Sequence, residues 1–358
     1  MNPPRNSNRT RNPRAAVRPN GRTPIIRPRL LSMTMASGKT SAYDRNFEQH
    51  LVDNKIFLNN RLAPKNLAEI TSRLSQPRPS LSLSTYPEEE FQKFWKACDT
   101  SLTEAKVMSA AIPIMVGTTS DIPSAENLIF NNLKPLTDGS LVAAKPDLYD
   151  GTRPENIHPH VRGELGSVIL PSTTHNAPAL PNFFIEAKGP DGIAGVAKRQ
   201  ACYDGALGAR GMACVQKFGG GPISDSNAVT ITSTFNDGNL KLYAVHLTGS
   251  RSPEGPKYHM TQLRSFAMTD QLDSFLQGVR YLRNARDWAM EQRDKAVRAA
   301  NLRVPLIRIS RIEPIDLHDA SRGAALANAP AKRRQSQRIA RLIGRDSGYP
   351  TRGSLTGK

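Results

Sequence analysis

The clearest apolar run in the chain covers residues 183–185, Phe-Phe-Ile, between the pairs 181–182 and 189–190, Pro-Asn and Gly-Pro. A short apolar run bounded by turn-forming residues predicts a β-strand. Because side chains alternate along a strand, Glu186 and Lys188 are expected to project from the same face. Two opposite charges at the end of an otherwise apolar strand are unusual, since ionised groups placed against a core need partners.

Residues 87–98 predict an amphipathic helix. Proline followed by three glutamates suits its first turn, and its apolar residues recur at the spacing of one helical face, as Phe91, Phe94, Trp95 and Cys98. Further helices are expected over 44–58, 67–74, 193–216 and 269–303. The apolar segment 105–116 either extends the first helix or forms a strand. Beyond Asn284 the last helix becomes highly charged, so its far end is expected to leave the core.

Two β-rich runs, 229–235 and 240–247, flank the tetrapeptide Asn-Asp-Gly-Asn at 236–239. Asp-Gly between such runs is a strong hairpin signal, so this pair is expected to complete the sheet. Residues 154–178 are interpreted as a loop-rich insertion. Its three histidines do not have the spacing of a structural zinc site, and exposed loop positions explain them better: His158, His160 and His175.

Positive charge is concentrated at both ends of the chain. Of the formal net charge of +18, residues 1–43 carry eight arginines and one lysine with no acid. Residues 321–358 carry nine basic residues and a single acid, so the middle of the chain is close to neutral. Arginine-rich tails bind polyanions, carry localisation signals or remain as disordered linkers. We therefore expect disordered basic tails and a folded, near-neutral middle.

Three cysteines, Cys98, Cys202 and Cys214, do not suggest a disulfide framework and fit a reducing compartment. No apolar run reaches the ~18 residues that a membrane span requires. The N-terminal segment lacks the apolar stretch of a secretory signal, and its prolines disfavour the amphipathic helix of a mitochondrial presequence. The expected location is the nucleus or the cytoplasm, with the basic tails favouring the nucleus.

The candidate chemistry lies in Asp147, Glu186 and Lys188. The two carboxylates are hard oxygen ligands of the kind that Mg²⁺ takes, and the main-chain carbonyl of Ala187 is a plausible third ligand. A bound metal acidifies water and offsets the charge that grows on a phosphate. The lysine is suited to hold that water or stabilise the transition state. The plainer interpretation of Glu-Ala-Lys is a solvated strand end, and the Pro-Asp pair at 146–147 argues against it.

These residues resemble a known signature. Pro146-Asp147 followed by Glu186-Ala187-Lys188 resembles that of the PD-(D/E)XK nuclease superfamily, which has the restriction-endonuclease-like fold. More narrowly, segments 144–147, 181–192 and 199–210 resemble a PD-(D/E)XK-like domain found in many fungal proteins. The resemblance covers roughly residues 85–250. It implies an α/β (α+β) core with a mixed four-stranded sheet flanked by helices, a divalent metal (Mg²⁺ or Mn²⁺), and phosphodiester cleavage. The 39 positions from Asp147 to Glu186 require an insertion between the two strands.

The helix expected over 193–216 supplies further candidates. Gln200 and Tyr203 resemble, with a spacing one residue shorter, the Gln and Tyr of the RecB-type branch; Gln200 is a candidate to orient the phosphate or a metal-bound water. Lys198, Arg199 and Arg210 are candidates to contact a nucleic-acid backbone, against the alternative of an ordinary helix surface. The superfamily often adds an acidic residue from a preceding helix. Glu126 is the nearest candidate, although a surface position explains it better.

Four segments are therefore expected: a disordered basic tail (1–41), short helices with a linker (42–85), a nuclease-like domain (86–303) and a second disordered basic tail (304–358). Three functions remain open. The first is a Mg²⁺-dependent nuclease acting on DNA or RNA. The second is an inactive nuclease-like domain that binds nucleic acid or protein. The third is a nuclear interaction protein in which the tails do the work.

Overall fold

A single mixed sheet organises the fold. The computed structural model describes residues 39–58, 62–117, 121–223 and 225–310. Within them seven strands pair: β1 (Ile56–Phe57), β2 (Ser124–Glu126), β3 (Leu148–Thr152), β4 (Ala179–Lys188), β5 (Ala228–Asn236), β6 (Asn239–Thr248) and β7 (Lys257–Ala267). Their order across the sheet is β1-β7-β6-β5-β4-β3-β2. The described residues thus form an α/β fold.

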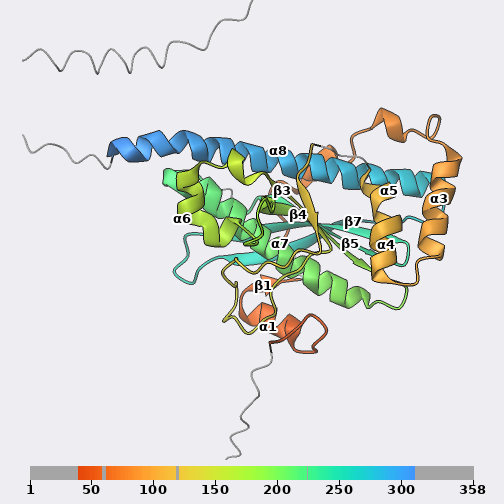
Figure 1. Ribbon diagram of the computed structural model, residues 1–358, viewed down its shortest axis with the longest axis horizontal. Coiled ribbons are helices and arrows are strands. Elements are labelled where there is room, and N and C mark those ends of the chain that lie inside the picture. Colours follow the sequence, from red (N-terminus) through yellow and green to blue (C-terminus); the bar gives the residue numbers. More distant parts are fainter. Residues whose placement is uncertain (1–38, 59–61, 118–120, 224, 311–358) are drawn as a thin grey trace, which may run out of the picture.

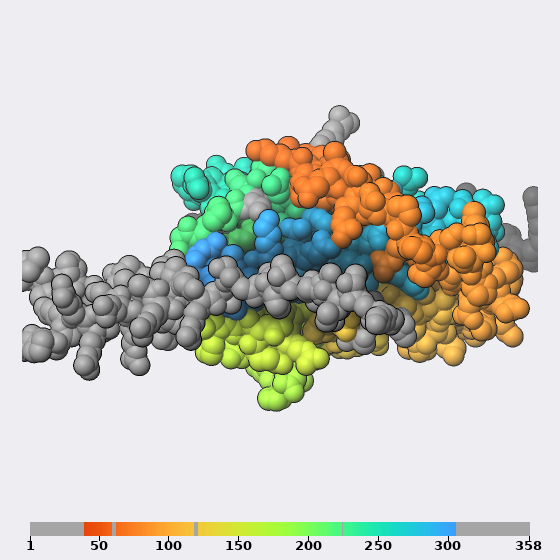
Figure 2. Space-filling view, turned by 90° about the horizontal axis from the view of Figure 1, so that it is seen from above, coloured from red at the N-terminus to blue at the C-terminus, as the bar shows by residue number. Residues whose placement is uncertain are grey.

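Helices cover both faces of this sheet (Figure 1). They are α1 (Phe47–Asp53), α2 (Leu67–Leu74), α3 (Glu88–Asp99), α4 (Glu104–Ala110), α5 (Ile112–Val116), α6 (Pro159–Ile169), α7 (Ala194–Lys217) and α8 (Leu272–Ser310), with the 3₁₀ turns η1 (Pro79–Leu81), η2 (Pro154–Asn156) and η3 (Phe218–Gly220). The long helix α8 lies along one face, and α7 crosses the other. Figure 2 shows α8 at the surface between the N-terminal helices and α6.

The strands β3, β4 and β5 position the candidate residues. β3 is antiparallel to β4, with Leu148 opposite Ile185 and Tyr149 opposite Phe184. Continuing this register by one position places Asp147 across from Glu186. β5 is parallel to β4, and α7 forms the crossover between them, as a parallel pair requires.

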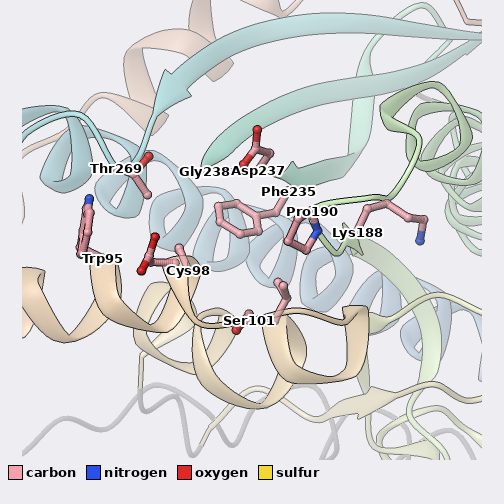
Figure 3. Close-up of a pocket in the computed structure, with 11 residues that line it drawn as sticks. Trp95, Cys98, Ser101, Lys188, Pro190, Phe235, Asp237, Gly238 and Thr269 are labelled. Atoms are coloured by element: carbon pink, nitrogen blue, oxygen red, sulfur yellow. The ribbon is translucent and has the colours of Figure 1, made fainter.

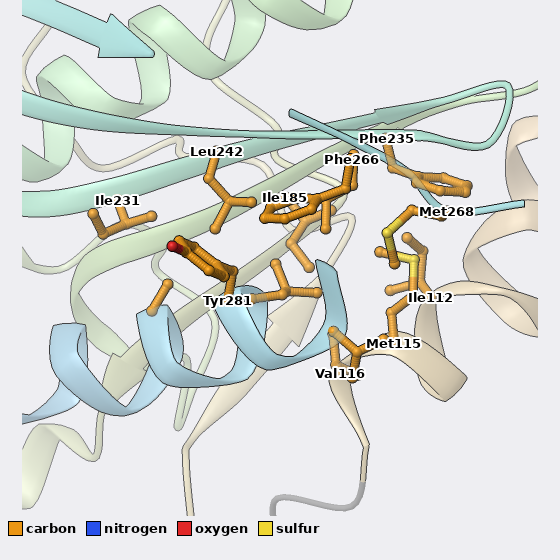
Figure 4. Packing of buried hydrophobic residues seen from close by; sticks show 14 of the residues in the cluster. Ile112, Met115, Val116, Ile185, Ile231, Phe235, Leu242, Phe266, Met268 and Tyr281 are labelled. Carbon is orange, nitrogen blue, oxygen red and sulfur yellow. The ribbon is translucent and has the colours of Figure 1, made fainter. Parts of the chain in front are cut away.

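Alternation along β4 divides its side chains between two cores. Phe183 and Ile185 pack on the α8 face, together with residues of β5, β6 and β7 (Figure 4). Phe184 packs on the α7 face, against side chains from α7 and α1. Glu186 continues the second series, so its carboxyl group is directed toward α7. The alternation along β4 therefore places an ionisable carboxyl group inside the protein.

Buried polar contacts fix α8 to the sheet. The guanidinium of Arg286 binds both carboxylate oxygens of Asp150 on β3, with Nε 2.8 Å from Oδ2 and Nη2 2.9 Å from Oδ1. Arg293 donates to the amide oxygen of Asn182 on β4. The Asn182 amide in turn donates to the carbonyls of Val229 and Ala289. These groups are almost completely buried.

Several predictions from the sequence are confirmed. The helix over 67–74 is α2, the one beginning at Pro87 is α3, and the one over 193–216 is α7. The hairpin is β5–β6, whose two-residue turn has positive φ at Asp237 and Gly238 (46° and 68°), as a type I′ turn requires. The apolar segment 105–116, by contrast, neither extends α3, which ends at Asp99, nor forms a strand; it forms the separate helices α4 and α5.

Other predictions are wrong. The far half of α8 does not leave the core, because Ala296, Val297 and Ala300 pack against α6 and α7 residues. The insertion is less loop-rich than expected, since it contains α6. The helix expected over 44–58 ends at Asp53 and is followed by β1. The sheet of the described residues is larger than the four-stranded core that the resemblance implies, because β6, β7 and β1 extend it beyond β5 to seven strands.

Two further predictions concern the ends of the chain and membranes. The expected disorder of the basic tails falls mainly on residues 1–38 and 311–358, which lie outside the described residues. Within the part of the chain that the structure describes, no helix combines the length and the apolar character needed to cross a membrane.

Candidate functional site

The structure brings Asp147, Glu186 and Lys188 together at the end of β4. The ammonium nitrogen of Lys188 lies 3.7 Å from Asp147 Oδ2 and 4.0 Å from Glu186 Oε2. All three residues are buried, with exposed fractions of 4%, 0% and 3% in the order of their numbers. Three ionisable side chains from two separate segments thus form one cluster in a largely dry environment.

The backbone of β4 holds the Asp147 carboxylate. The main-chain N–H of Ala187 donates to Asp147 Oδ2 at 2.8 Å. Burial raises the pKa of Asp147 to about 6, although the Lys188 ammonium and this N–H act in the opposite direction. The aspartate is therefore fixed in orientation and costly to ionise without a nearby positive charge.

Lys188 is bound on two sides. Its ammonium donates to the carbonyl oxygen of Ala187 at 2.7 Å and to Glu104 Oε2 at 2.9 Å. Burial lowers the pKa of Lys188, but the neighbouring carboxylates, Asp147 first, outweigh burial and leave the pKa above its usual value. The lysine is consequently a charged ammonium lying among acidic oxygens.

Glu104 reaches the cluster from the first turn of α4. The close approach of α4 requires Gly189, where a Cβ would lie 3.0 Å from the Glu104 main-chain nitrogen. Gly192 is needed for a similar reason, because its Cβ would lie 2.5 Å from the Cβ of Lys188. Glu126, the acidic candidate from the sequence, lies instead on the edge strand β2 with an exposed side chain. The acidic residue that a helix brings to Lys188 is therefore Glu104.

Asp204 joins the site from α7, and sequence reasoning did not identify it. Its side chain is 2% exposed and faces the carboxyl group of Glu186 within hydrogen-bonding range. When both are ionised, neither can donate: Glu186 Oε1, Glu186 Oε2 and Asp204 Oδ2 are all buried without a hydrogen-bond donor. Gln200 Oε1 is buried and unsatisfied as well. An acid one turn after Gln200, within a helix rich in small apolar residues, was the signal available in the sequence.

The acid pair has strongly perturbed pKa values. Burial raises the pKa of Glu186 well above its usual range, and the charges of Asp204 and Asp147 raise it further. Burial likewise raises the pKa of Asp204 to about 7. Groups perturbed this far are concentrated at functional sites, where a cation or a proton compensates the buried charge.

The cluster borders two separate cavities. One, of about 150 Å³, is lined by Glu186, Gln200 and Asp204, with Lys145 also contributing to its wall. The other, also about 150 Å³, has Lys188 at one end and the half-exposed Trp95 at the other (Figure 3). The carboxylate pair and the ammonium therefore face different openings of the protein.

The candidate nucleic-acid contacts have varied surroundings. Lys198 lines a cavity of about 330 Å³ together with Lys241. Arg199 donates to the carbonyl of Ala42 at 2.7 Å, and Arg210 donates to that of Pro135 at 3.2 Å. The two arginines are thus engaged by main-chain carbonyls.

The donor chemistry fits a hard divalent cation. The two oxygens of Glu186 have no donor, and Asp147 with the Ala187 carbonyl adds oxygen ligands beside them. Among the described residues, no group of three or more His, Cys, Asp or Glu side chains has an arrangement that could hold a metal ion. Two carboxylates and a carbonyl are nevertheless sufficient for Mg²⁺, which keeps several of its waters. The Lys188 ammonium lies among these same oxygens.

Comparison of the chain with models of known protein families, with curated proteins and with solved structures gave no match.

Proposed function

We propose that this protein is a divalent-metal-dependent nuclease of the PD-(D/E)XK type, which hydrolyses phosphodiester bonds of DNA or RNA. The observation that carries the proposal is the cluster of Asp147, Glu186 and Lys188, in which the carboxyl group of Glu186 is fully buried and faces a second buried acid, Asp204. Buried acids that face one another cost stability when they ionise, and a bound cation would offset that cost.

The sheet supports the same proposal. β2, β3 and β4 are successively antiparallel, and β5 is parallel to β4. This four-stranded part of the sheet is mixed and flanked by helices, as the resemblance implies. The insertion between Asp147 and Glu186, which contains α6, leaves β3 and β4 paired next to the cluster.

Asp147, Glu186 and the carbonyl of Ala187 would hold Mg²⁺ or Mn²⁺. When bound, the ion supplies Lewis-acid chemistry by polarising a phosphate oxygen and acidifying a water. The chain's own contribution is positioning and charge. The Ala187 N–H fixes the Asp147 carboxylate, and the Lys188 ammonium offers protons to hold a water or to stabilise developing negative charge.

Substrate contacts are proposed for residues around the cluster. Lys198 borders a cavity next to the start of α7 and is suited to a phosphate. Gln200 lies beside Glu186 and is suited to orient a water or a phosphate oxygen. For Arg199 and Arg210, contact with nucleic acid requires release from the carbonyls that they now bind. The basic tails would add sequence-independent affinity that weakens with salt.

One observation favours a second candidate, an inactive nuclease-like module that binds nucleic acid or protein. The Lys188 ammonium already donates to Ala187 and Glu104, so the chain's own cation partly neutralises the acids. In this alternative the cluster is a structural ion-pair network and no metal enters it.

A cleavage assay separates the two candidates. Labelled single- and double-stranded DNA and RNA are incubated with the full-length protein and Mg²⁺ or Mn²⁺. The nuclease proposal predicts metal-dependent cleavage that Glu186→Gln and Lys188→Met reduce by at least about 100-fold, the scale of one lost catalytic group. Glu126→Gln, on the exposed edge strand, is the matched control and retains wild-type activity. Intact substrates with every metal, or equal cleavage by wild type and Glu186→Gln, would exclude the proposal.

A further inference from the structure

We propose that the cavity between Trp95 and Lys188 binds one unpaired, amino-bearing base of a single-stranded nucleic acid, DNA or RNA. This proposal rests on the proposed function, under which nucleic acid lies at the neighbouring cluster, and it names the substrate class that the site takes. It is carried by the indole of Trp95, which is 44% exposed at one end of a cavity whose other end is formed by Lys188 (Figure 3).

The core does not account for the exposed position of Trp95. The sequence predicts that Trp95 shares the apolar face of its helix with Phe91 and Phe94, but only these two are buried. The Phe94 ring packs against the rings of Phe235 and Phe275, whose centres lie 6.2 and 4.6 Å away. Trp95, the next residue of α3, remains half-exposed beside this packing. An indole in such a place offers an apolar face on which a flat ring can stack.

The walls and the size of the cavity fit one planar ring. The apolar part of the wall consists of Phe235, Val107 and Pro190. The thiol of Cys98 also lines the cavity and is neutral at physiological pH, because burial and the charge of Asp237 raise its pKa to about 12. The volume is about 150 Å³, a size at which a protein cavity accepts one six-membered aromatic ring. The cavity thus has room for one base and not for a base pair.

Two carboxylates make the cavity suit a base rather than a phosphate. Asp99 and Asp237 line it, and both residues are exposed. Their negative charge repels a phosphate, whereas the amino groups of cytosine, adenine and guanine are donors that a carboxylate accepts. Lys188 carries positive charge at the opposite end, so the cavity lacks the uniformly negative surroundings that would favour a cationic side chain. This combination selects a neutral, planar ligand that carries hydrogen-bond donors.

The cavity is joined to the candidate cluster through Lys188. The Lys188 side chain lines the cavity, and its ammonium nitrogen lies 3.7 Å from Asp147 Oδ2 and 4.0 Å from Glu186 Oε2. Because one residue borders both places, a phosphate at the cluster brings a base of the same or the next nucleotide to the cavity. In a duplex that base is paired and stacked on both faces. Only an unpaired base, or one turned out of the helix, can lie on the indole of Trp95.

Hydrogen bonds hold the rim of the cavity in place. The main-chain N–H of Met268 donates to the carbonyl of Gly238 at 2.7 Å and so fixes the hairpin turn that carries Asp237. The amide of Asn236 donates to the two glycine carbonyls of the 189–192 turn at 3.3 and 3.2 Å. This turn forms another part of the wall. A base therefore meets walls that are already ordered, which reduces the entropic cost of binding.

Tryptophan fluorescence reports the occupancy of this site. The chain has two tryptophans, and the second, Trp288, is 2% exposed, so an added ligand quenches mainly Trp95. The full-length protein with Mg²⁺ is titrated with labelled phosphorothioate oligonucleotides, which resist hydrolysis: single-stranded DNA, single-stranded RNA and a blunt DNA duplex. Salt at ~0.3 M weakens the contribution of the basic tails. Single strands are expected to quench Trp95, whereas the duplex, at equal occupancy measured by anisotropy of the label, is not.

Variants assign the binding to the cavity. Trp95→Ala is expected to bind single strands at least about fivefold more weakly, the lower limit for one lost stacking contact, while Trp95→Phe recovers most of the affinity. Gln92→Ala, exposed on the same helix and outside the cavity, is the matched control and binds as wild type does. Wild type should prefer oligo-dC to oligo-dU at least about fivefold, because only cytosine offers an amino group. Asp237→Asn, which suits the turn, should reduce this preference.

Any of four results overturns the inference: no quenching by saturating single strands, equal quenching by the duplex, equal affinity for oligo-dC and oligo-dU, or a Trp95→Ala variant that binds as tightly as Gln92→Ala. Quenching by a tetra-arginine peptide but not by single strands would also overturn it and would identify a protein-binding pocket. Circular dichroism shows that each variant is folded before it is titrated.

The outcome is distinguishable from that of the proposed function. Quenching by single strands, together with intact ordinary substrates at every metal, supports the base-binding site and sinks the nuclease. Metal-dependent cleavage that Trp95→Ala leaves unchanged, at equal rates on single strands and duplex, does the reverse.

Discussion

Replacing Arg286 by methionine tests how the candidate site is anchored. The Arg286 guanidinium makes a two-pronged contact with Asp150 on β3 and also lies 3.2 Å from Ser124 Oγ on β2. It is 2% exposed, and its guanidinium carbon lies 5.9 Å from the ring centre of Phe183. The side chain of Arg286 thus links α8 to the strands β2, β3 and β4. Its partner Asp150 lies three residues after Asp147 in the sequence.

The expected loss in the free energy of unfolding follows from the buried Asp150 carboxylate, which loses its arginine partner. Methionine fills much of the volume but leaves the Asp150 carboxylate buried with only the Ser124 hydroxyl as donor. Removing one partner of a buried ion pair costs about 3–5 kcal/mol in the free energy of unfolding. Adding Asp150→Asn removes the unpaired buried charge. The double variant should therefore recover about 1–2 kcal/mol in the free energy of unfolding relative to Arg286→Met alone.

Urea unfolding at neutral pH gives the free energies, provided that the dependence on denaturant is unchanged among variants. Arg283→Met is the matched control on the same helix. Arg283 donates to the carbonyls of Met115 and Ile114, so its removal leaves no buried charge unpaired. The free energy of unfolding should therefore fall by less, about 1–3 kcal/mol. The reasoning is refuted if Arg286→Met costs no more than Arg283→Met, or if Asp150→Asn brings no recovery.

Two further predictions concern stability. Burial lowers the pKa of His246 to about 4, with its stacked histidine neighbour contributing. Because the folded-state pKa lies below that of the unfolded chain, this stability is present above pH ~6.5 and is lost as the pH falls toward 4, by at most about 3 kcal/mol. His246→Leu should flatten that part of a urea-unfolding pH profile; an unchanged slope contradicts the assignment. Gly208→Ala should cost about 1–3 kcal/mol by forcing α7 away from β4. Gly195→Ala, in the same helix with its nearest contact at 3.6 Å, should be neutral or stabilising by up to about 1 kcal/mol. Equal effects of the two glycine variants in thermal unfolding would contradict the packing argument.

Local signals made part of the site predictable. The run at 183–185 and the charges of Glu186 and Lys188 are adjacent in sequence, so strand alternation alone relates them. The pairing of Asp147 with this strand followed from the resemblance, and the register of β3 and β4 agrees with it. These positions depend on short-range periodicity and on one strand pairing.

Asp204 and Glu104 were not predictable in the same way. Their contacts with Glu186 and Lys188 depend on how closely α7 and α4 approach the sheet, which the glycines at 205, 208 and 189 allow. A single sequence shows those glycines but not the distances they permit. The acidic candidate chosen from the sequence was therefore Glu126 on the edge strand β2, and not Glu104, which contacts Lys188.

The buried half of α8 was mispredicted for a related reason. Arg286 and Arg293 are charged, and a charged helix end is ordinarily solvated. Here each has a buried partner on another element, Asp150 on β3 and Asn182 on β4.

The strand β7 was missed because only its first half is buried, while its second half alternates with exposed polar residues.

The most direct test of the central claim is the anomalous scattering of crystals soaked in Mn²⁺. The account predicts a peak within ~2.0–2.6 Å of oxygens of Asp147 and Glu186, with the Lys188 ammonium displaced from the Ala187 carbonyl. A map without a peak at saturating Mn²⁺, with Lys188 still 2.7 Å from that carbonyl, would contradict it.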